Sequence, residues 1–474
     1  MTAAKKLPLE FAAGHQAPTG PDSPPAKAGG PKAPAPTADA RVASAARTAY
    51  IDARLLDPAS GLDAPGALLT EGAEIADFGP GLFADGVPEG IETVDCGAHC
   101  LAPGLVDMRV QLREPGEEHK ETIMTAGRAA AAGGVTTMIC LPNTTPVIDD
   151  AALVEFVISR GRKAGGANVY PYAAITQGLE GKRMTEMGLL DAAGAVAFTD
   201  GTKAVADALV MRRALSYAST FDLLIVQHPE EPSLAAGGHM NEGETSTRLG
   251  LVGIPAAAEV IMIERDIRLV ELTGARYHVA HVSTAEGVEA VRRAKARGLP
   301  VTCDTAPHYF GLNETAVGEY RTFAKLSPPL RAETDRQAIV EGVKDGTIDA
   351  IASDHAPQDQ ESKRLPFAQA APGIIGLETL LPLILELHHN GHLPLADLLR
   401  RVTSAPADLL GLEAGALRKG GPADLVLFDP DRPWKIDDKR FLSKSKNSPF
   451  DGRPVQGQAL RTAVGGRTVF IRED

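Results

Sequence analysis

The sequence predicts an α/β protein built around a (β/α)8 barrel of the TIM type, with a small β-sandwich domain formed from both ends of the chain. Apolar segments alternate with Ala-rich helical stretches over about 255 residues, a length typical of such barrels. Short β-rich segments flank this repeat and predict the second domain. A Gly-rich phosphate turn after an early strand, which a doubly wound sheet would need, is absent.

Composition divides the 474 residues into four stretches. Residues 1–46 are rich in Pro, Ala and Gly and nearly lack large apolar side chains, which predicts a disordered tail. Residues 47–102 and 416–474 predict the two parts of the β-sandwich, and residues 103–415 predict the barrel. The strand-like segments of the β-sandwich are Tyr50–Leu56, Ala67–Asp77, Ala423–Asp429 and Ala463–Ile471.

Each predicted barrel strand is a short apolar segment that ends in polar residues. The eight segments are Leu105–Gln111, Val135–Asn143, Asn168–Ile175, Ala195–Asp200, Leu223–His228, Arg276–Ser283, Val301–His308 and Ala350–Pro357. In barrels of this type the chemistry lies at the C-terminal ends of the strands. We therefore expect the functional side chains at the ends of these eight segments.

Charge and cysteine content restrict the function classes. The formal net charge of −13 argues against nucleic acid or an anionic membrane as the main partner, although a local basic pocket can still hold a small anion. No apolar run approaches the length of a membrane span. Four cysteines in so long a chain do not make a disulfide framework, so we expect reduced thiols and a cytoplasmic protein.

Three candidate functional residues stand at strand ends. His228 and His281 end the fifth and sixth segments, and Asp354 lies in the eighth. Two imidazoles and a carboxylate that converge on a barrel mouth are suitable ligands for zinc, and Asp354 could also act as a general base. His308 follows Pro307 and is interpreted as a hydrogen-bonded structural residue.

Several motifs together resemble class I dihydroorotases of the amidohydrolase superfamily. They occur in family order from about Tyr50 to the C-terminus, and they are LAPGLVDMRVQLREPG (101–116), LPNTTP (141–146), GETSTRLGLVGIPAAAE (243–259), His278–Ser283, Pro307–His308, Ser353–Pro357, PGIIGLET (372–379) and SKSKNSPFDG (443–452). The resemblance implies a barrel with an appended β-sandwich, one or two zinc ions, and ring closure of carbamoyl aspartate to dihydroorotate in pyrimidine synthesis. It also implies that Arg113 and Asn143 hold the substrate carboxylate.

The chain departs from the family pattern at the metal site. The first strand of the family ends in His-x-His, two metal ligands, where this chain has Arg109 and Gln111. Arginine offers no lone pair, and its guanidinium would repel zinc and could pair with Asp354 or Asp200 instead. Further departures are Gly201 for the second strand-four Asp, Ser327 for a substrate-binding Asn, and Gln358 for a substrate-contacting His.

These departures leave three hypotheses. The first is a catalytically silent homologue that is retained as a structural partner of aspartate transcarbamoylase, within a homo- or hetero-oligomer. The second is an active cyclic amidohydrolase with one zinc ion, held by His228, His281 and Asp200. The third is a hydantoinase relative, which would need a carbamylated Lys at the end of strand four, whereas the first Lys after that strand is Lys203.

Overall fold

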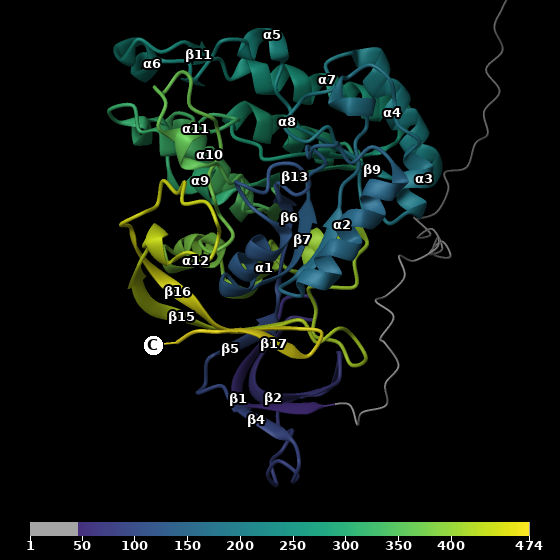
Figure 1. Ribbon diagram of the computed structural model, residues 1–474, viewed down its shortest axis with the longest axis vertical. Coiled ribbons are helices and arrows are strands. Elements are labelled where there is room, and N and C mark those ends of the chain that lie inside the picture. Colours follow the sequence, from purple (N-terminus) through teal and green to yellow (C-terminus); the bar gives the residue numbers. More distant parts are fainter. Residues whose placement is uncertain (1–45, 474) are drawn as a thin grey trace, which may run out of the picture. The chain divides into compact units, whose positions relative to one another are not determined.

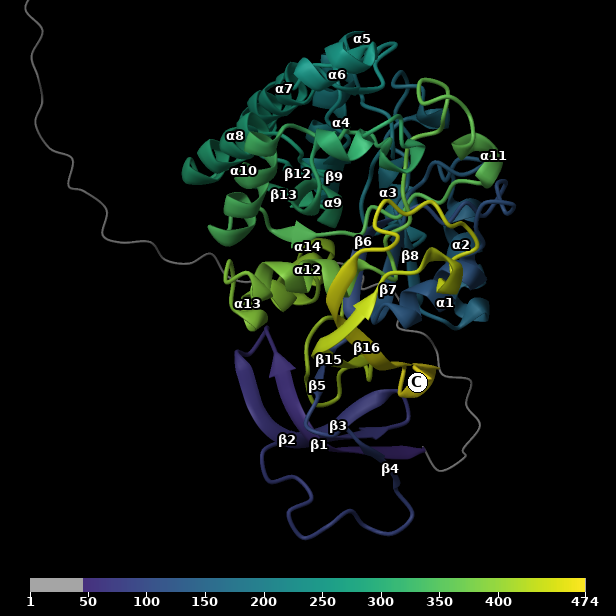
Figure 2. The same ribbon diagram turned by 90° about the vertical axis from the view of Figure 1, so that its left-hand side faces the viewer.

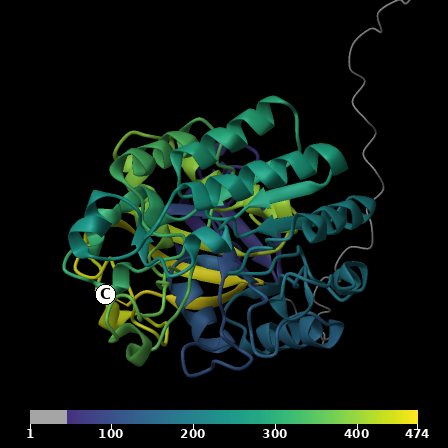
Figure 3. The same cartoon turned by 90° about the horizontal axis from the view of Figure 1, so that it is seen from above.

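The computed structural model describes residues 46–473, so the tail predicted for residues 1–46 lies, apart from Ala46, outside the described residues. The centre of the described chain is a set of parallel strands surrounded by helices (Figures 1 and 3). The strands are β6 (Leu105–Val110), β7 (Val135–Cys140), β8 (Asn168–Pro171), β9 (Leu224–Gln227), β12 (Arg276–Val279), β13 (Val301–Thr305) and β14 (Ala350–Ile351). Six of the seven begin at the predicted residue and β9 begins one residue later; β6 and β9 end one residue earlier than predicted, and the others end three to six residues earlier.

Parallel pairing connects these strands in the order of a (β/α)8 barrel. β6, β7 and β8 form one ladder, and β9, β12, β13 and β14 form another. Bridges from Ala173 to Phe198 and from Phe198 to Ile225 link the two ladders on one side. A bridge from Val110 to His355 links the segment after β14 back to β6. The predicted α/β barrel class is confirmed.

The predicted fourth strand, Ala195–Asp200, is reduced to a bridge at Phe198. Its backbone is hydrogen-bonded to the two neighbouring strands within residues 196–199, for example from the Phe198 amide to the Leu224 carbonyl at 3.0 Å. The chain then turns at Gly201, whose φ of +70° is left-handed and suits glycine. Because the chain turns there, the ladder cannot continue, and Asp200 still lies at the C-terminal end of the bridge.

The second unit of structure is one eight-stranded sheet made from both ends of the described chain (Figure 2). Its strands are β1 (Arg47–Asp57), β2 (Leu62–Glu71), β3 (Glu74–Gly79), β4 (Glu92–Asp95), β5 (Cys100–Pro103), β15 (Leu425–Lys435), β16 (Pro454–Val464) and β17 (Arg467–Ile471). β15 pairs antiparallel with β5, which joins the two halves. The single strand expected at Ala67–Asp77 is instead a hairpin of β2 and β3, because the chain turns at Gly72 with a φ of +60°.

Helices cover the barrel strands. They are α1 (Ile123–Ala132), α2 (Ala151–Ala164), α3 (Met187–Ala192), α4 (Ala208–Phe221), α5 (Pro232–Ala235), α6 (Glu244–Leu249), α7 (Ala257–Thr273), α8 (Ala285–Ala296), α9 (Pro307–Gly311), α10 (Glu333–Lys344), α11 (Gln360–Lys363), α12 (Leu380–His389), α13 (Leu395–Arg400) and α14 (Ser404–Leu410). A two-stranded ladder of β10 (Met240–Asn241) and β11 (Gly253–Ile254) lies between α5 and α7 in the chain. Within residues 46–473, no helix combines the length and apolarity that crossing a bilayer requires.

The sheet packs directly on the barrel. β16 contacts α12, and the Thr462 hydroxyl donates to the Ala131 carbonyl at the end of α1 at 2.7 Å. Val426 and Phe428 of β15 belong to the same apolar core as the barrel helices. The four cysteines are buried and unpaired, which agrees with the predicted reduced thiols. The two ends of the described chain therefore help to complete the barrel core.

Replacing Phe428 with Ala should lower the free energy of unfolding by about 3–5 kcal/mol, because Phe428 is fully buried and its removal leaves a cavity between the sheet and the barrel. Phe221→Ala is the matched control, since that ring is 53% exposed. Urea unfolding followed by circular dichroism measures both variants. Equal losses in the two would contradict the packing described here.

Candidate functional site

The centre of the barrel mouth holds a buried ion pair between Arg109 and Asp354. Arg109 lies on β6, and its Nε donates to Asp354 Oδ1 at 2.9 Å. Its Nη2 donates to the Gly201 carbonyl at 3.3 Å, whereas its Nη1 has no partner among the described residues. Arg109 is only 2% exposed. The guanidinium therefore occupies the position at which the family resemblance implies a metal-ligating imidazole.

Asp354 faces the mouth because the chain turns sharply after β14. Its φ is +51°, and His281 after β12 also has a positive φ, of +38°. Backbone of this kind costs about 1–3 kcal/mol per residue and persists where the surrounding structure enforces it. Burial opposes ionisation of Asp354, but His281 and Arg109 outweigh it and hold the pKa of that carboxyl well below its usual range.

His228 and His281 meet at the mouth, as the sequence predicts. His228 Nδ1 and His281 Nε2 lie 2.9 Å apart, and His281 Nδ1 lies 3.2 Å from Asp354 Oδ2. Burial, together with the charge on Arg109, lowers the pKa of His281 to about 4. His281 is therefore neutral at pH 7.

Asp200 does not join the two histidines. Its carboxylate accepts the Thr176 amide at 2.9 Å and the Thr176 hydroxyl, and burial raises its pKa. Asp200, His228 and His281 do not place three donor atoms within 4.8 Å of one another. The structure thus brings together two of the three ligands predicted for a single zinc ion.

The predicted carboxylate-binding residues are occupied by internal contacts. Arg113 is buried and donates to the Pro357 carbonyl at 3.1 Å and to Glu117 at 2.9 Å. Asn143 donates through Nδ2 to Gln111 Oε1 at 3.1 Å. Both side chains thus carry internal hydrogen bonds, while the remaining N–H donors of the Arg113 guanidinium and of the Asn143 amide are not engaged by these contacts.

The other departures from the family pattern lie around the same mouth. Gly201 adopts a left-handed φ, and a Cβ there would lie 3.3 Å from Asn143 Cβ, so the missing carboxylate has little space. Gln358 is buried and donates to the Pro372 carbonyl at 2.8 Å. Ser327 is half-buried, directly before Pro328.

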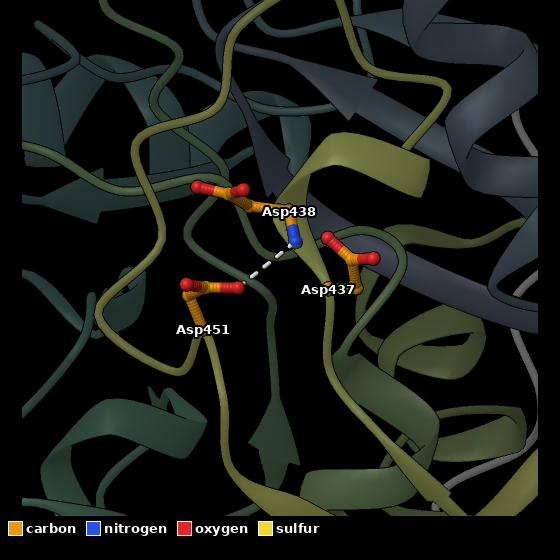
Figure 4. Close-up of side chains that lie close together, drawn as sticks. All are labelled: Asp437, Asp438 and Asp451. Carbon is orange, nitrogen blue, oxygen red and sulfur yellow. Dashed lines mark hydrogen bonds between the residues drawn. The ribbon is translucent and has the colours of Figure 1, made fainter.

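The donor set does not fit a two-ion zinc centre. The first-strand ligands are replaced by a guanidinium and an amide, and Asp354 is engaged by Arg109. Catalytic zinc generally takes three protein ligands, whereas two imidazoles converge here. In the part of the chain that the structure describes, the one set of three metal-type donors within 4.8 Å is Asp437, Asp438 and Asp451 (Figure 4). These acids lie in the C-terminal segment, where the Asp438 amide donates to Asp451 Oδ1 at 3.1 Å.

Two residues at the mouth, the buried His308 and the half-buried Glu230, were not identified as functional from the sequence. His308 is the second residue of α9, and its Nε2 lies 3.7 Å from Asp354 Oδ2 without a hydrogen-bond partner among the described residues. Burial lowers the pKa of His308 to about 4. Glu230 lies 3.5 Å from His228 Nε2. The signal for His308 was its position after the seventh strand, and Glu230 follows the His228 strand end by two residues.

The fold and the side chains at its strand ends define an amidohydrolase-type barrel. L-hydantoinase (dihydropyrimidinase) from Arthrobacter aurescens matches 90% of this chain and 96% of its own with a TM-score of 0.81 at 25% identity. D-hydantoinase (dihydropyrimidinase) from Thermus sp. matches 90% of this chain and 97% of its own with a TM-score of 0.77 at 23% identity.

Residues 97–287 match the family model described as dihydro-orotase-like. A protein named dihydroorotase from Anaplasma phagocytophilum is 50% identical over 431 residues, which cover 90% of this chain and 95% of the relative. A dihydroorotase from Pelobacter propionicus is 50% identical over 419 residues, which cover 88% of this chain and 98% of the relative. The chain belongs to the dihydroorotase family.

Replacing Asp354 with Asn should lower the free energy of unfolding by about 3–5 kcal/mol, because it leaves the buried Arg109 charge without its counter-ion. Replacing both partners with apolar residues, as Arg109→Met with Asp354→Leu, should recover most of that loss. Glu71→Gln is the control, since the Arg47–Glu71 pair is exposed and worth at most about 1 kcal/mol. Urea unfolding at pH 7 measures all three. A loss at Asp354 no larger than at Glu71 would contradict a buried ion pair.

Proposed function

We propose that this dihydroorotase-family protein of pyrimidine biosynthesis has exchanged the metal centre of its family for the Arg109–Asp354 ion pair and is catalytically silent or severely impaired. The observation that carries the proposal is the 2.9 Å contact between Arg109 Nε and Asp354 Oδ1. Hydrolysis of a cyclic amide in this family generally uses zinc to polarise the carbonyl and supply hydroxide. A buried guanidinium at the ligand position repels such an ion, and it engages the carboxylate that would otherwise move the proton.

The substrate contacts point in the same direction. Arg113 is paired with Glu117, and Asn143 with Gln111, so the groups expected to hold carbamoyl aspartate or dihydroorotate are each engaged by a neighbouring side chain. The His281 imidazole is shared between His228 and Asp354. These side chains stabilise one another, and this is the arrangement expected of a structural rather than a reactive barrel mouth.

A single-zinc cyclic amidohydrolase is the second candidate. His228 Nδ1 and His281 Nε2 face each other at 2.9 Å, and two ligands of one ion could converge in this way. With water completing the set, zinc would supply a polarising charge at these two residues. In this candidate the Arg109 guanidinium either moves away from Asp354 or stays near the zinc ion, where the two positive charges repel each other.

Zinc content and turnover distinguish the two candidates. Protein purified without chelator should contain zinc in a clearly substoichiometric amount relative to the protein chain, and it should not interconvert carbamoyl aspartate and dihydroorotate. Replacing Arg109 and Gln111 with His should raise zinc uptake, because it returns two imidazoles to one strand face. Arg54→His is the control, since that exposed arginine pairs with Asp63 in the β-sheet. Stoichiometric zinc with turnover in the unaltered chain would contradict the silent assignment and favour the single-zinc enzyme.

We further propose that the silent barrel is a structural partner of aspartate transcarbamoylase, the preceding enzyme of the pathway. The support is the resemblance to non-catalytic family members together with a scaffold that is kept intact around an altered mouth. A silent barrel retains a large folded surface, and assembly with another enzyme is a function that needs no metal.

Co-expression with aspartate transcarbamoylase from the same organism tests this partnership. The two chains should co-elute in gel filtration at a mass above that of either alone, and this association should survive Arg109→His with Gln111→His, since both residues are buried. Separate elution, with transferase activity unchanged by the added chain, would contradict it.

A further inference from the structure

Helices α3, α4 and α7 expose a group of large apolar side chains on the outside of the barrel. The three helices follow one another along one side of the barrel (Figure 1), and α4 packs against α7. Of the thirteen large apolar side chains that are exposed within residues 46–473, five lie on these helices, each 50–66% exposed. They are Leu189, Leu209, Phe221, Ile261 and Leu272. We call this surface the α3–α4–α7 face.

α3 and α4 form one continuous part of this face. The Tyr217 ring of α4 lies 5.1 Å from the Phe221 ring, and its hydroxyl accepts the Gly188 amide of α3 at 3.4 Å. Leu189 directly follows Gly188 in the chain. An open groove lies beside Tyr217, and Leu209 lines it. The exposed apolar side chains of the two helices are therefore grouped around Tyr217.

α7 extends the face on the other side of α4. Arg265 of α7 donates to the Ala206 carbonyl, shortly before α4 begins, at 2.6 Å. Ile261 and Leu272 are separated by about three helical turns, so they project from the same side of α7 as Arg265. The face thus runs from α3 across α4 to the outer side of α7.

The exposed apolar area matches what a homodimer interface needs. The five side chains leave about 500 Å² of apolar surface in contact with water, which is within the range of the largest apolar patch on a typical monomer and often marks an interaction site. A dimer interface of standard size buries about 800 Å² per partner, and about 65% of a homodimer interface is apolar. The five side chains would therefore supply most of the apolar area that a stable dimer buries.

The charges on α4 are self-complementary. Arg212 and Arg213 lie in the first half of α4, are exposed, and have no ion pair within residues 46–473. Asp222 directly follows the helix, where the last backbone carbonyls also favour a cation. A two-fold axis that crosses α4 near Ser216 makes the two copies of the helix antiparallel, so the arginines of each copy lie beside the Asp222 end of the other.

The helices on either side of α4 are complementary across the same axis. The axis brings α3 of one copy against α7 of the other. Glu186 and Asp191 give α3 two carboxylates that have no ion pair among the described residues. Arg268 of α7 is exposed, and the carboxylate that it faces, Glu271, is also engaged by Arg297 of α8. Opposite charges therefore meet on both sides of α4.

We propose that the α3–α4–α7 face is the contact between two copies of this chain, packed about a two-fold axis that passes near Ser216 in the middle of α4. In this dimer, Leu189 of each copy faces the apolar side chains of α7 of the other. The proposal goes beyond the proposed function, because the face lies on the outside of the barrel. Self-association there needs neither a metal at the mouth nor a second kind of protein.

Light scattering coupled to gel filtration measures the mass of the full chain purified alone. At micromolar concentration the unaltered protein should have twice the chain mass of 49.6 kDa. Leu189→Glu with Leu272→Glu should raise the dissociation constant of the dimer at least about a hundredfold and give the mass of one chain, because charges would be buried in the apolar part of the interface. Both residues are exposed in the single chain, so the fold should be retained, which circular dichroism checks. Ile471→Glu on β17 is the control, since Ile471 is 53% exposed on the β-sheet.

Cross-linking tests the position of the axis. A residue beside a two-fold axis lies close to its own copy, so Ser216→Cys should give a covalent dimer with a short bismaleimide cross-linker. The four native cysteines are buried, which leaves the introduced thiol as the exposed one. Ser60→Cys, at an exposed turn after β1, is the control and should remain a single chain.

Three results would overturn the proposal. The first is a single-chain mass for the unaltered protein at about 100 μM, far above the dissociation constant of a stable dimer. The second is a dimer that survives Leu189→Glu with Leu272→Glu, or that is not cross-linked through residue 216. The third is an unaltered chain that is single when alone but loses co-elution with aspartate transcarbamoylase on these substitutions, since the face would then bind the transferase. Zinc content and turnover play no part in these measurements, so failure of the proposed function leaves their outcome unchanged.

Discussion

The buried ion pair between Arg109 and Asp354 determines the arrangement of the barrel mouth. A guanidinium that is 2% exposed needs a counter-ion at hydrogen-bond distance, because an unpaired charge in that environment costs several kcal/mol. Asp354 supplies the counter-ion from the opposite end of the barrel sequence, at the cost of a left-handed backbone. His281 Nδ1 lies 3.2 Å from the second oxygen of Asp354, and His228 Nδ1 lies 2.9 Å from the other ring nitrogen of His281. One substitution on β6 is thereby coupled to three other strand ends.

This network supports the proposal that the chain keeps the fold of its family but lacks catalytic activity. The barrel, the appended sheet and the histidines of the fifth and sixth strands agree with the dihydroorotase family, whose relatives are 50% identical over nearly the whole described chain. The first strand carries Arg109 and Gln111 where the resemblance implies two metal-ligating histidines. Metal binding depends on a few donor atoms, whereas the fold depends on many apolar contacts. Metal binding can therefore be lost while the fold is retained.

Much of the fold was predictable because it follows from local pattern. Short apolar segments that alternate with amphipathic helices predict parallel strands in sequence order, and the starts of seven of them agree with the structure to within one residue. Their ends were predicted too late, since polar residues such as Gln111 and Ser283 follow the strand without joining the ladder. The fourth strand was overestimated, since within the predicted Ala195–Asp200 only Phe198 forms bridges to both neighbours before the chain turns at Gly201. The hairpin of β2 and β3 was predicted as one strand because a glycine turn at Gly72 lies inside the apolar segment.

By itself the sequence determined the family, the barrel, the position of His228, His281 and Asp354 at strand ends, and the absence of imidazoles at positions 109 and 111, because each follows from residue identity and spacing. It left open whether Arg109 pairs with Asp354 or with Asp200, and it gave no reason to exclude Asp200 from the histidines or to place His308 beside Asp354. Only the tertiary structure decided these points. They depend on which side chains converge from strands distant in the sequence, and convergence is set by packing, backbone turns and burial rather than by any local pattern.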